Sequence, residues 1–582
     1  MKTLFFLLVL AIAISSPAQA QSTQLAFAQA AVVGATTSQT TSPIYVRGAA
    51  TDVQGNTYFT GIFGGTISFG SFSLTGTSGY DVFVAKRDAA GNYLWAVRGG
   101  GLGAKQVLGL AVDAAGDVVV TGSFDDRTVS FGGILLTNAA QPTASPSNDV
   151  FVAKLSGSTQ TWLWAVSAGG GTRLNGDDQG RAAAVDVFGN VYVAGTFDSS
   201  VAFFGPNIQV ANPVQFSRGN VFLAKLTPAG QWVWAKGQDN LGGLVGGLST
   251  DPYGNVYLTG VFGGVPTVFG SVTLSSPRSS SGYVAKIDGA GTWQWAQLLR
   301  TARYAPYPQM YAARSDGRGV YVAGAYQGDT LQVGTTTLLN TGYIDSRNIR
   351  LPNAYVARLH AGTGAWQWVL QTTNTGSEGL STPQLDGAGH VLVAGGFAEV
   401  SGSGATFGTT TLHNAAGSDM IVTQLDTAGR WLWARQADAP STSNGSTLYG
   451  LDPQGRGLLW GVFRAASAQL GSFALSAYPG QGTPTVSYAT VFTAQLGANG
   501  PLAAKAQGQV GLALFPNPAH HAVTVTGLAP GQSVQVLDVL GRIVLRATVP
   551  TKGDLYVLLP VTLPTGIYVV RAGSQARRLV VE

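Results

Sequence analysis

The 582-residue sequence has no cysteine, only three methionines and five histidines, and few charged residues, 10% of the chain against roughly 25% in an average soluble domain. The absence of cysteine excludes disulfides, thiolate metal sites and a lipid anchor on a mature N-terminal cysteine. Low charge with 12 tryptophans argues against disorder, which needs the opposite composition. The 80 glycines argue against long helices, because a glycine inside a helix costs about 1 kcal/mol. The composition therefore leaves a fold of many short strands joined by glycine turns.

The N-terminus has the features of a secretory signal. Lys2 precedes the apolar run from Leu4 to Ile14, and Ala18 and Ala20 form a small-x-small cleavage site. We therefore predict a signal peptide over residues 1–20 and an exported mature chain that starts near Gln21. No transmembrane segment is expected after its removal.

Internal repetition dominates the rest of the sequence. An element of the form Asp-x-x-Gly-Asn-x-Tyr-x-Thr/Ala-Gly-x-Phe, seen in Asp52 to Phe63, occurs in seven more or less degraded copies. A Phe-Gly element and a hairpin ending in Trp-x-Trp follow each copy in the same order. The copies share one glycine and have a mean period of about 67 residues: Gly61, Gly122, Gly195, Gly260, Gly324, Gly395 and Gly461.

Each repeat predicts a small antiparallel sheet, because its segments alternate apolar and polar residues and are rich in Val, Phe, Tyr and Trp. The repeated Asp is expected to close an Asx-type turn, and the Gly to take a left-handed conformation. Sevenfold repetition of a four-stranded unit predicts an all-β fold, a seven-bladed β-propeller over residues 21–507, with tryptophans packed between neighbouring blades. We expect the spare strand 25–30 to close the last blade, with 501–506 as linker.

The copies Asp186-Val-Phe-Gly-Asn-Val-Tyr-Val-Ala-Gly and Asp149-Val-Phe-Val-Ala-Lys-Leu resemble the repeat of bacterial secreted seven-bladed β-propellers, the SBBP repeat. The resemblance covers roughly residues 21–507, and its specificity comes from the recurrence of the element. It implies an extracytoplasmic propeller and brings no catalytic motif with it.

After Gly508 the tryptophans stop, and alternating runs predict a small β-sandwich over residues 508–582. This segment resembles the type A C-terminal sorting domain of the type IX secretion system of some Gram-negative bacteria. The matching residues include a Pro-Asn-Pro element, two glycines and a tyrosine: Pro516, Asn517, Pro518, Gly541, Gly566 and Tyr568. The resemblance implies export through the periplasm and outer membrane, recognition by the type IX secretion machinery, and a final place in the medium or on the outer cell surface.

No catalytic, cofactor-binding or metal-binding residue is predicted. The histidines are dispersed, and neither a nucleophile elbow nor a phosphate-binding glycine loop is visible. The repeated Asp-x-x-Gly-Asn supplies one carboxylate per turn, which is typical of a turn and not of a calcium loop. Basic and acidic residues nearly balance in the repeats, which argues against nucleic acid binding.

One position of the repeat carries a cation in five copies: Lys86, Lys154, Lys225, Lys286 and Arg358. These residues would either line the axis as a cationic ring or contact the tryptophan of the paired strand. The contact with tryptophan is the interpretation we favour.

The loops that join each Trp strand to the next repeat are the least repetitive segments and must emerge on one face, where binding sites are usually built. The ligand-binding candidates in these loops are Arg173, Asp177, Asp178, Arg303 and Tyr304. The leading hypothesis is a non-catalytic scaffold that binds a glycan or protein. The alternatives are a polysaccharide hydrolase or lyase with a site in the propeller funnel, and a purely structural surface or biofilm component.

Overall fold

The computed structural model consists of two compact units, Met1–Gly500 and Pro501–Glu582, and its described elements are all strands. It describes residues 27–581 except 33–34, 37–43, 53, 78, 102–104, 140–146, 171–176, 213–219, 239–242, 264–265, 277–279, 302–308, 345–349, 374–376, 382, 387–388, 399–403, 414–418, 438–445, 452–456, 464–466, 471–472, 477–489, 497–512, 516–518, 520–521, 527–530, 539–541, 550–554, 561–562 and 573–574. The signal peptide and the linker 501–506 predicted from the sequence lie outside the described residues.

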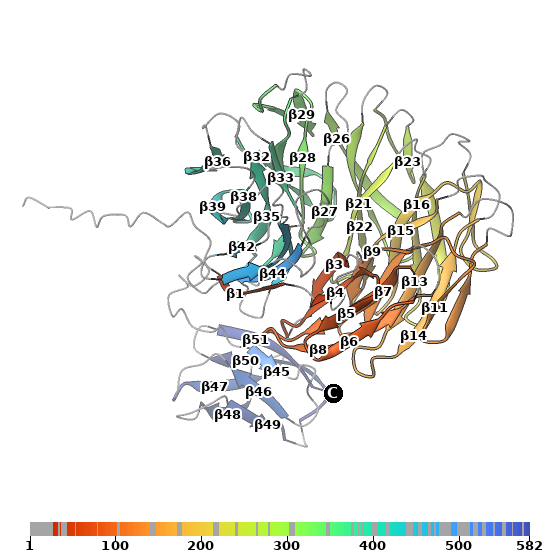
Figure 1. Ribbon diagram of the computed structural model, residues 1–582. Coiled ribbons are helices and arrows are strands. Elements are labelled where there is room, and N and C mark those ends of the chain that lie inside the picture. The colour runs from red at the N-terminus through yellow and green to blue at the C-terminus, as the bar shows by residue number, and fades with distance from the viewer. Residues whose placement is uncertain are drawn as a thin grey trace, which may run out of the picture. The chain divides into compact units, whose positions relative to one another are not determined.

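The first unit is a seven-bladed β-propeller, as predicted, and each blade is an antiparallel sheet (Figure 1). In every blade but the last the strands run in chain order from the inside outward. The innermost strands are β3 (Ile44–Thr51), β9 (Lys105–Val112), β15 (Gln179–Val185), β21 (Leu244–Thr250), β27 (Gln309–Ser315), β33 and β34 (Ser377–Leu380 and Gln384–Leu385), and β40 (Ser446–Leu451). The second strands are β4 (Thr57–Phe63), β10 (Val118–Phe124), β16 (Val191–Phe197), β22 (Val256–Phe262), β28 (Gly319–Tyr326), β35 (Val391–Ala398) and β41 (Gly457–Phe463).

The two outer positions of each blade are formed by the hairpin that contains the tryptophans. The third strands are β7 (Asp81–Arg87), β13 (Asp149–Leu155), β19 (Asn220–Leu226), β25 (Ser281–Ile287), β31 (Asn353–His360), β38 (Asp419–Leu425) and β44 (Thr490–Leu496). The outermost strands are β8 (Tyr93–Gly99), β14 (Trp162–Ala168), β20 (Trp232–Gln238), β26 (Trp293–Thr301), β32 (Trp366–Gln371), β39 (Trp431–Ala437) and, in the last blade, β1 (Phe27–Val32).

The core lies between the blades, because successive side chains of a strand point to opposite faces of its sheet. Val118 and Val120 of β10 pack in one cluster with Tyr58 of the first blade. Val119, between them in the sequence, packs with Val191 of the third blade. A second or third strand is therefore buried along its whole length, which explains why these strands read as continuous apolar runs.

Each repeat also contains a short hairpin between its second and third blade strands, which the sequence analysis recognised only as a Phe-Gly element. The seven hairpins are β5–β6 (Thr66–Phe69 and Phe72–Thr75), β11–β12 (Thr128–Phe131 and Ile134–Thr137), β17–β18 (Val201–Phe203 and Gln209–Ala211), β23–β24 (Thr267–Phe269 and Val272–Leu274), β29–β30 (Thr330–Val333 and Thr336–Leu339), β36–β37 (Ala405–Phe407 and Thr410–Leu412) and β42–β43 (Ser467–Leu470 and Phe473–Ser476).

These hairpins cover the outer edge of the preceding blade. Leu299 at the end of β26 pairs with Val333 of β29 in the following blade, and Gly169 after β14 forms a bridge to Phe203 of β17. An exposed outer strand invites pairing with another chain. The hairpin therefore protects part of each edge and adds a second contact between neighbouring blades.

The ring is closed by the N-terminal strand, as predicted. β1 pairs with β44 in the last blade, with Ala30 opposite Ala494. The chain continues into β2 (Ala35–Thr36), which pairs with β5 of the first blade. The innermost strands contact one another from the first to the fifth blade and from the sixth to the seventh, β33 of the sixth contacts β28 and β31 of the fifth, and β40 of the last blade contacts β3 of the first.

The second unit is a small sandwich, in agreement with the sequence prediction. One sheet holds β45 (Ala513–Phe515), β46 (Ala522–Thr526) and β49 (Leu555–Leu558), and the other holds β47 (Ser533–Leu537), β48 (Ile543–Thr548), β50 (Gly566–Ala572) and β51 (Gln575–Val581). Val525, Val536 and Val570 belong to one buried cluster that both sheets share. Tyr568 donates a hydrogen bond from its hydroxyl to the Pro564 carbonyl oxygen, at 2.7 Å.

Candidate functional site

The repeated aspartates build turns, as predicted. Asp186 accepts hydrogen bonds at Oδ1 from the backbone N–H groups of Phe188 and Asn190, and at Oδ2 from the Asn190 side chain and the Tyr192 hydroxyl. Burial and the neighbouring Asp186 carboxylate raise the pKa of Tyr192, so its hydroxyl remains a donor. These bonds engage both oxygens of the carboxylate within the turn.

In four of the five blades the cation of the third strand lies over a tyrosine and not over a tryptophan as predicted, and Lys154 in the remaining blade pairs with Asp113 and Asp117. Lys86 is opposite Trp95 in the strand register, but its ammonium group lies over the ring of Tyr58 on the other neighbouring strand, 4.8 Å from the centroid. Tyr58 is the partner of Lys86 on β4, the strand that pairs with the other edge of β7. The same geometry recurs in other blades with Lys225 over Tyr192, Lys286 over Tyr257 and Arg358 over Tyr321.

The cation and the second tryptophan of the hairpin fasten one blade to the next in the third, fourth and fifth blades. Lys286 Nζ and Trp295 Nε1 both donate to the Ala361 carbonyl oxygen in the following blade, each at 3.1 Å. Arg358 and Trp368 share the Thr427 carbonyl oxygen in the same way, and Lys225 and Trp234 share that of Gly289. In the first two blades, Lys86 and Lys154 pair with Asp52 and Asp113 of their own blade. Because all five cations lie on third strands and are bonded there, the alternative of a cationic ring around the axis is also wrong.

The innermost strands carry a bulge at one level in five successive blades. In β15 the register passes from Gly180–Gly195 to Ala182–Ala194, so Arg181 has no partner on the neighbouring strand. Bulges bend a strand and re-aim the side chain of the extra residue. The bulged residues of the first five blades are Arg47, Leu108, Arg181, Gly246 and Tyr311.

The bulge explains the glycine shared by all repeats. A Cβ atom placed on Gly195 would overlap the carbonyl oxygen of Gln179, which the bulge brings over the second strand. Gly61 and Gly122 have the same relationship with the carbonyl oxygens of Tyr45 and Gln106. A glycine inside a strand often marks a bulge or a close backbone approach. That signal was present in the sequence, where the glycine served only to measure the repeat period.

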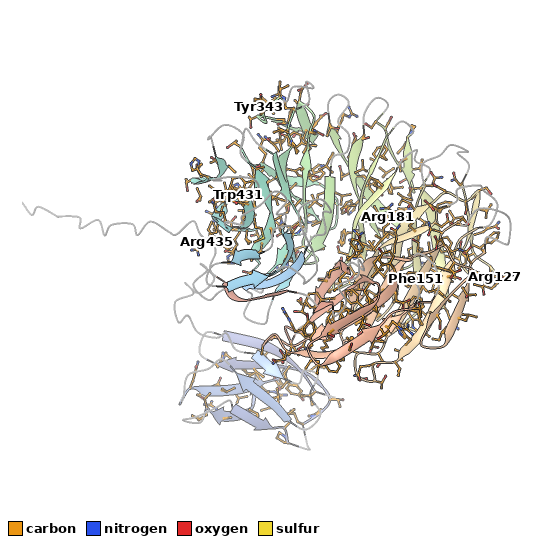
Figure 2. The ribbon with its side chains drawn as sticks, in the orientation of Figure 1. Arg127, Phe151, Arg181, Tyr343, Trp431 and Arg435 are labelled. Atoms are coloured by element: carbon orange, nitrogen blue, oxygen red, sulfur yellow. The ribbon has the colours of Figure 1, made fainter. Side chains whose placement is uncertain are left out.

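Two of the bulged residues are arginines on the innermost strands. Arg47 is exposed, and its guanidinium carbon lies 5.3 Å from the centroid of the Tyr45 ring. Arg181 is half-buried and donates from Nε to Thr196 Oγ1 at 3.3 Å. Burial lowers the pKa of Arg181, and the charge of Asp177 opposes this shift. Figure 2 shows Arg181 near the inner strands and Arg127 at the periphery of the propeller.

Arg181 follows the variable loop with Arg173, Asp177 and Asp178, whereas the segment before Arg47 was not among the loops predicted to bind a ligand. Both segments enter the innermost strands at the end that we call the loop face, which includes Asp177 and Asp178. Arg173, Arg303 and Tyr304 lie outside the described residues. Asp177 is exposed, and its Oδ1 accepts a hydrogen bond from Asn148 Nδ2. The part of the loop face that is described thus combines Arg47, Arg181 and Asp177.

Asp178, in contrast, is 0% exposed and is not available to a ligand. It accepts bonds from the backbone N–H groups of Gly170 and Asp198 and from the Ser199 hydroxyl. Asp149, 1% exposed, lies close enough for the two charges to interact, and its Oδ1 has no hydrogen-bond partner. Burial raises the pKa of Asp149 to about 7 and that of Asp178 to about 6. Such values are typical of catalytic acids, but neither carboxyl group reaches the surface.

The family comparison identifies the C-terminal unit. Residues 513–582 match the secretion system C-terminal sorting domain. The match includes Gly566 and Tyr568 within the described residues, while Pro516, Asn517, Pro518 and Gly541 lie outside them. The chain is therefore exported by type IX secretion, to the cell surface or the medium. No helix in the described part of the chain has the length and apolar character needed to cross a membrane.

The chain is also similar to proteins outside the sorting-domain family. An uncharacterized WD repeat-containing protein of Acanthamoeba polyphaga mimivirus is 27% identical over an alignment of 307 residues. The alignment covers 43% of this chain and 22% of the relative, so the match spans about a fifth of that protein's length. A protein of unknown function from Dyadobacter fermentans is 11% identical, with a TM-score of 0.33 over 67% of this chain and 94% of that one.

Two further solved structures belong to proteins with different functions, an enzyme and a secretion-system component. The quinohemoprotein alcohol dehydrogenase of Comamonas testosteroni is 10% identical, with a TM-score of 0.34 over 86% of this chain and 80% of that one. PorZ, a surface component of the type IX secretion system of Porphyromonas gingivalis, is 10% identical, with a TM-score of 0.16 over 93% of this chain and all of that one. Likeness at this level carries no activity over to this chain.

Proposed function

We propose that the chain is an exported, non-catalytic recognition scaffold, with a propeller over residues 21–507 that binds an acidic polysaccharide at the axis on the loop face and a sorting unit over 508–582. The observation that carries the proposal is the pair of arginines at bulged positions of innermost strands. Arg47 and Arg181 stand at equivalent points of the first and third blades, where a regular strand would have a paired residue.

The fold does not need arginine at this position. The second and fourth blades build the same bulge with Leu108 and Gly246. A residue type that the scaffold does not dictate is free to serve recognition. Guanidinium groups bind carboxylate and sulfate groups through two parallel hydrogen bonds, and a rigid strand holds them with little entropy to lose.

The burial of Asp149 and Asp178 favours recognition without catalysis over a polysaccharide hydrolase. A glycosidase needs two accessible carboxyl groups about 5 to 9.5 Å apart. Asp149 and Asp178, whose raised pKa values would suit an acid and its partner, are both buried. A purely structural component does not need an exposed arginine at the bulge of an innermost strand, where Arg47 lies.

The test is affinity electrophoresis of the secreted chain through gels containing polygalacturonate, alginate or chondroitin sulfate, with release of reducing ends measured in parallel. We expect retardation by at least one acidic polymer without release of sugar ends. The double variant Arg47→Gln with Arg181→Gln should lose this retardation. The matched control is Arg127→Gln, because Arg127 is an exposed arginine at the periphery. Release of reducing ends, or full retardation of the double variant, would refute the proposal.

A further inference from the structure

Two aromatic side chains lie exposed at the opposite end of the propeller. Phe188 and Tyr253 occupy the Asp-x-x-Gly-Asn turns of the third and fourth blades and are 68% and 72% exposed. These turns join the first and second strands of each blade, whereas the bulges lie near the start of the first strand. We call this end the turn face, defined by the turns 186–190 and 251–255.

The turn itself does not require an aromatic residue at this position. The first blade has Gln54 there and the second has Ala115, and both donate the same backbone hydrogen bond to the aspartate of the turn. Phe188 and Tyr253 donate that bond as well, at 2.9 Å in each case. An aromatic ring exposed to water brings the turn no hydrogen bond that glutamine or alanine lacks.

Each ring is held in place by the next blade. A Cβ atom on Gly254 would come within 3.0 Å of Cε2 of Phe188, so the Phe188 ring rests against this glycine of the fourth blade. The Tyr253 ring rests in the same way against Gly317 of the fifth blade, at 2.6 Å from the position of a Cβ. Both glycines have positive φ. The rings are thus seated on backbone and lose little freedom when a ligand binds.

The aspartates of the two turns are hydrogen-bonded within the turns. Asp251 accepts bonds from Asn255 and Tyr257, as Asp186 does from the equivalent residues of its own turn. The Lys225 ammonium group donates to the Gly289 carbonyl oxygen at 2.7 Å. The exposed surface that the rings themselves offer is apolar, which suits the apolar face of a sugar ring.

We infer that Phe188 and Tyr253 form a second binding site, a stacking platform for the sugar rings of a neutral polysaccharide. Sheets that pack face to face are about 10 Å apart, so the rings on adjacent blades are offset along one line by about that distance. An extended sugar chain has apolar ring faces that fit such a row, with hydroxyl groups left in water. The apolar surface that the two rings and the neighbouring Val187 expose is far smaller than the roughly 800 Å² that each partner buries in a stable protein interface.

This site is independent of the proposed function, because it uses other residues, another face and an uncharged ligand. The probes are laminarin, xylan, galactomannan and hydroxyethyl cellulose, tested by affinity electrophoresis of the full secreted chain. We expect retardation by at least one of them and a loss of about tenfold in affinity in the double variant Phe188→Gln with Tyr253→Gln. Glutamine is chosen because Gln54 occupies the same turn position in the first blade.

Two controls separate this site from other causes. Leu163→Gln removes a side chain that is 49% exposed on the outermost strand and should leave the retardation unchanged. Arg47→Gln with Arg181→Gln should also leave it unchanged, so loss of the acidic site and loss of this site are distinguishable. Absence of retardation with all four polymers, or equal retardation of the Phe188 and Tyr253 double variant, would overturn the inference. Concentration-dependent dimerisation that the double variant abolishes would identify a second copy as the occupant and overturn it as well.

Discussion

Trp295 donates a hydrogen bond from its indole Nε1 to the carbonyl oxygen of Ala361, which belongs to the next blade, at 3.1 Å. The acceptor lies in the hairpin turn of that blade, and Gly364 of the same turn packs against the indole ring. Trp234 and Trp368 make the equivalent bonds to Gly289 and Thr427. The repeated tryptophan is therefore a fastener between blades as well as an apolar side chain.

Replacement of this tryptophan tests how much its hydrogen bond to the next blade contributes to stability. Trp295→Phe keeps an aromatic ring but removes the donor, whereas Trp366→Phe removes an indole N–H that is buried without a partner. Both variants exchange an indole for a phenyl ring, but only Trp295→Phe breaks a hydrogen bond, so we expect it to reduce the free energy of unfolding by about 1 kcal/mol more than Trp366→Phe. Urea unfolding followed by tryptophan fluorescence measures the difference. Equal losses would mean that the bond adds nothing.

The glycine opposite the bulge should not tolerate a side chain. In Gly195→Ala the new methyl group would overlap the Gln179 carbonyl oxygen, and the bulge would have to shift. We expect a loss of about 3 kcal/mol or more in unfolding free energy. Gly379→Ala is the matched control, because a Cβ there meets nothing within 4 Å. A small effect at both positions would show that the bulge is free to move.

Buried Asp149 should make stability depend on pH. Burial raises its pKa from 3.8 to about 7, so between these values the folded state holds a proton that the unfolded state has released. Folding is therefore most favoured at low pH, and the unfolding free energy falls by up to about 1.4 kcal/mol per pH unit as pH rises from about 4 to 7. Asp178, whose pKa is raised to about 6, changes stability in the same direction.

Asp149→Asn removes the titrating group. Asparagine already fills this position in the third and fifth blades, as Asn220 and Asn353. We expect the variant to be more stable than the parent at pH 8 and to show a weaker decline between pH 5 and pH 8. Chemical unfolding at both pH values checks this. An unchanged pH profile would show that Asp149 remains ionised in the folded protein.

The N-terminal strand should hold the ring closed. A chain that begins at residue 33 lacks β1 and leaves β44 as an open edge. We expect a lower thermal midpoint and faster aggregation, since an unpaired edge recruits other strands. A synthetic peptide of residues 25–36 should restore the midpoint when it is added in excess. Truncation at residue 27 is the control, and an equal effect of both truncations would contradict the role of β1.

Sequence repetition was sufficient for the architecture. A glycine and an aspartate that recur about every 67 residues, with alternating strands between them, define the number of blades and the turn chemistry, because these features depend on local hydrogen bonds and strand patterning. The spare strand before residue 32 pointed to the closure of the ring for the same reason. The C-terminal motif, with Tyr568 near its end, identified the route of export.

The individual side-chain contacts were beyond the sequence, since they depend on three-dimensional geometry that no local pattern encodes. The register placed Lys86 opposite Trp95, but twist and packing turned its ammonium group over Tyr58. The bulge that frees Arg181 from pairing comes from the close approach of the first two strands at Gly195. Likewise, the exposure of Phe188 is a property of its seat on Gly254 in the next blade, which exists only when the ring is assembled.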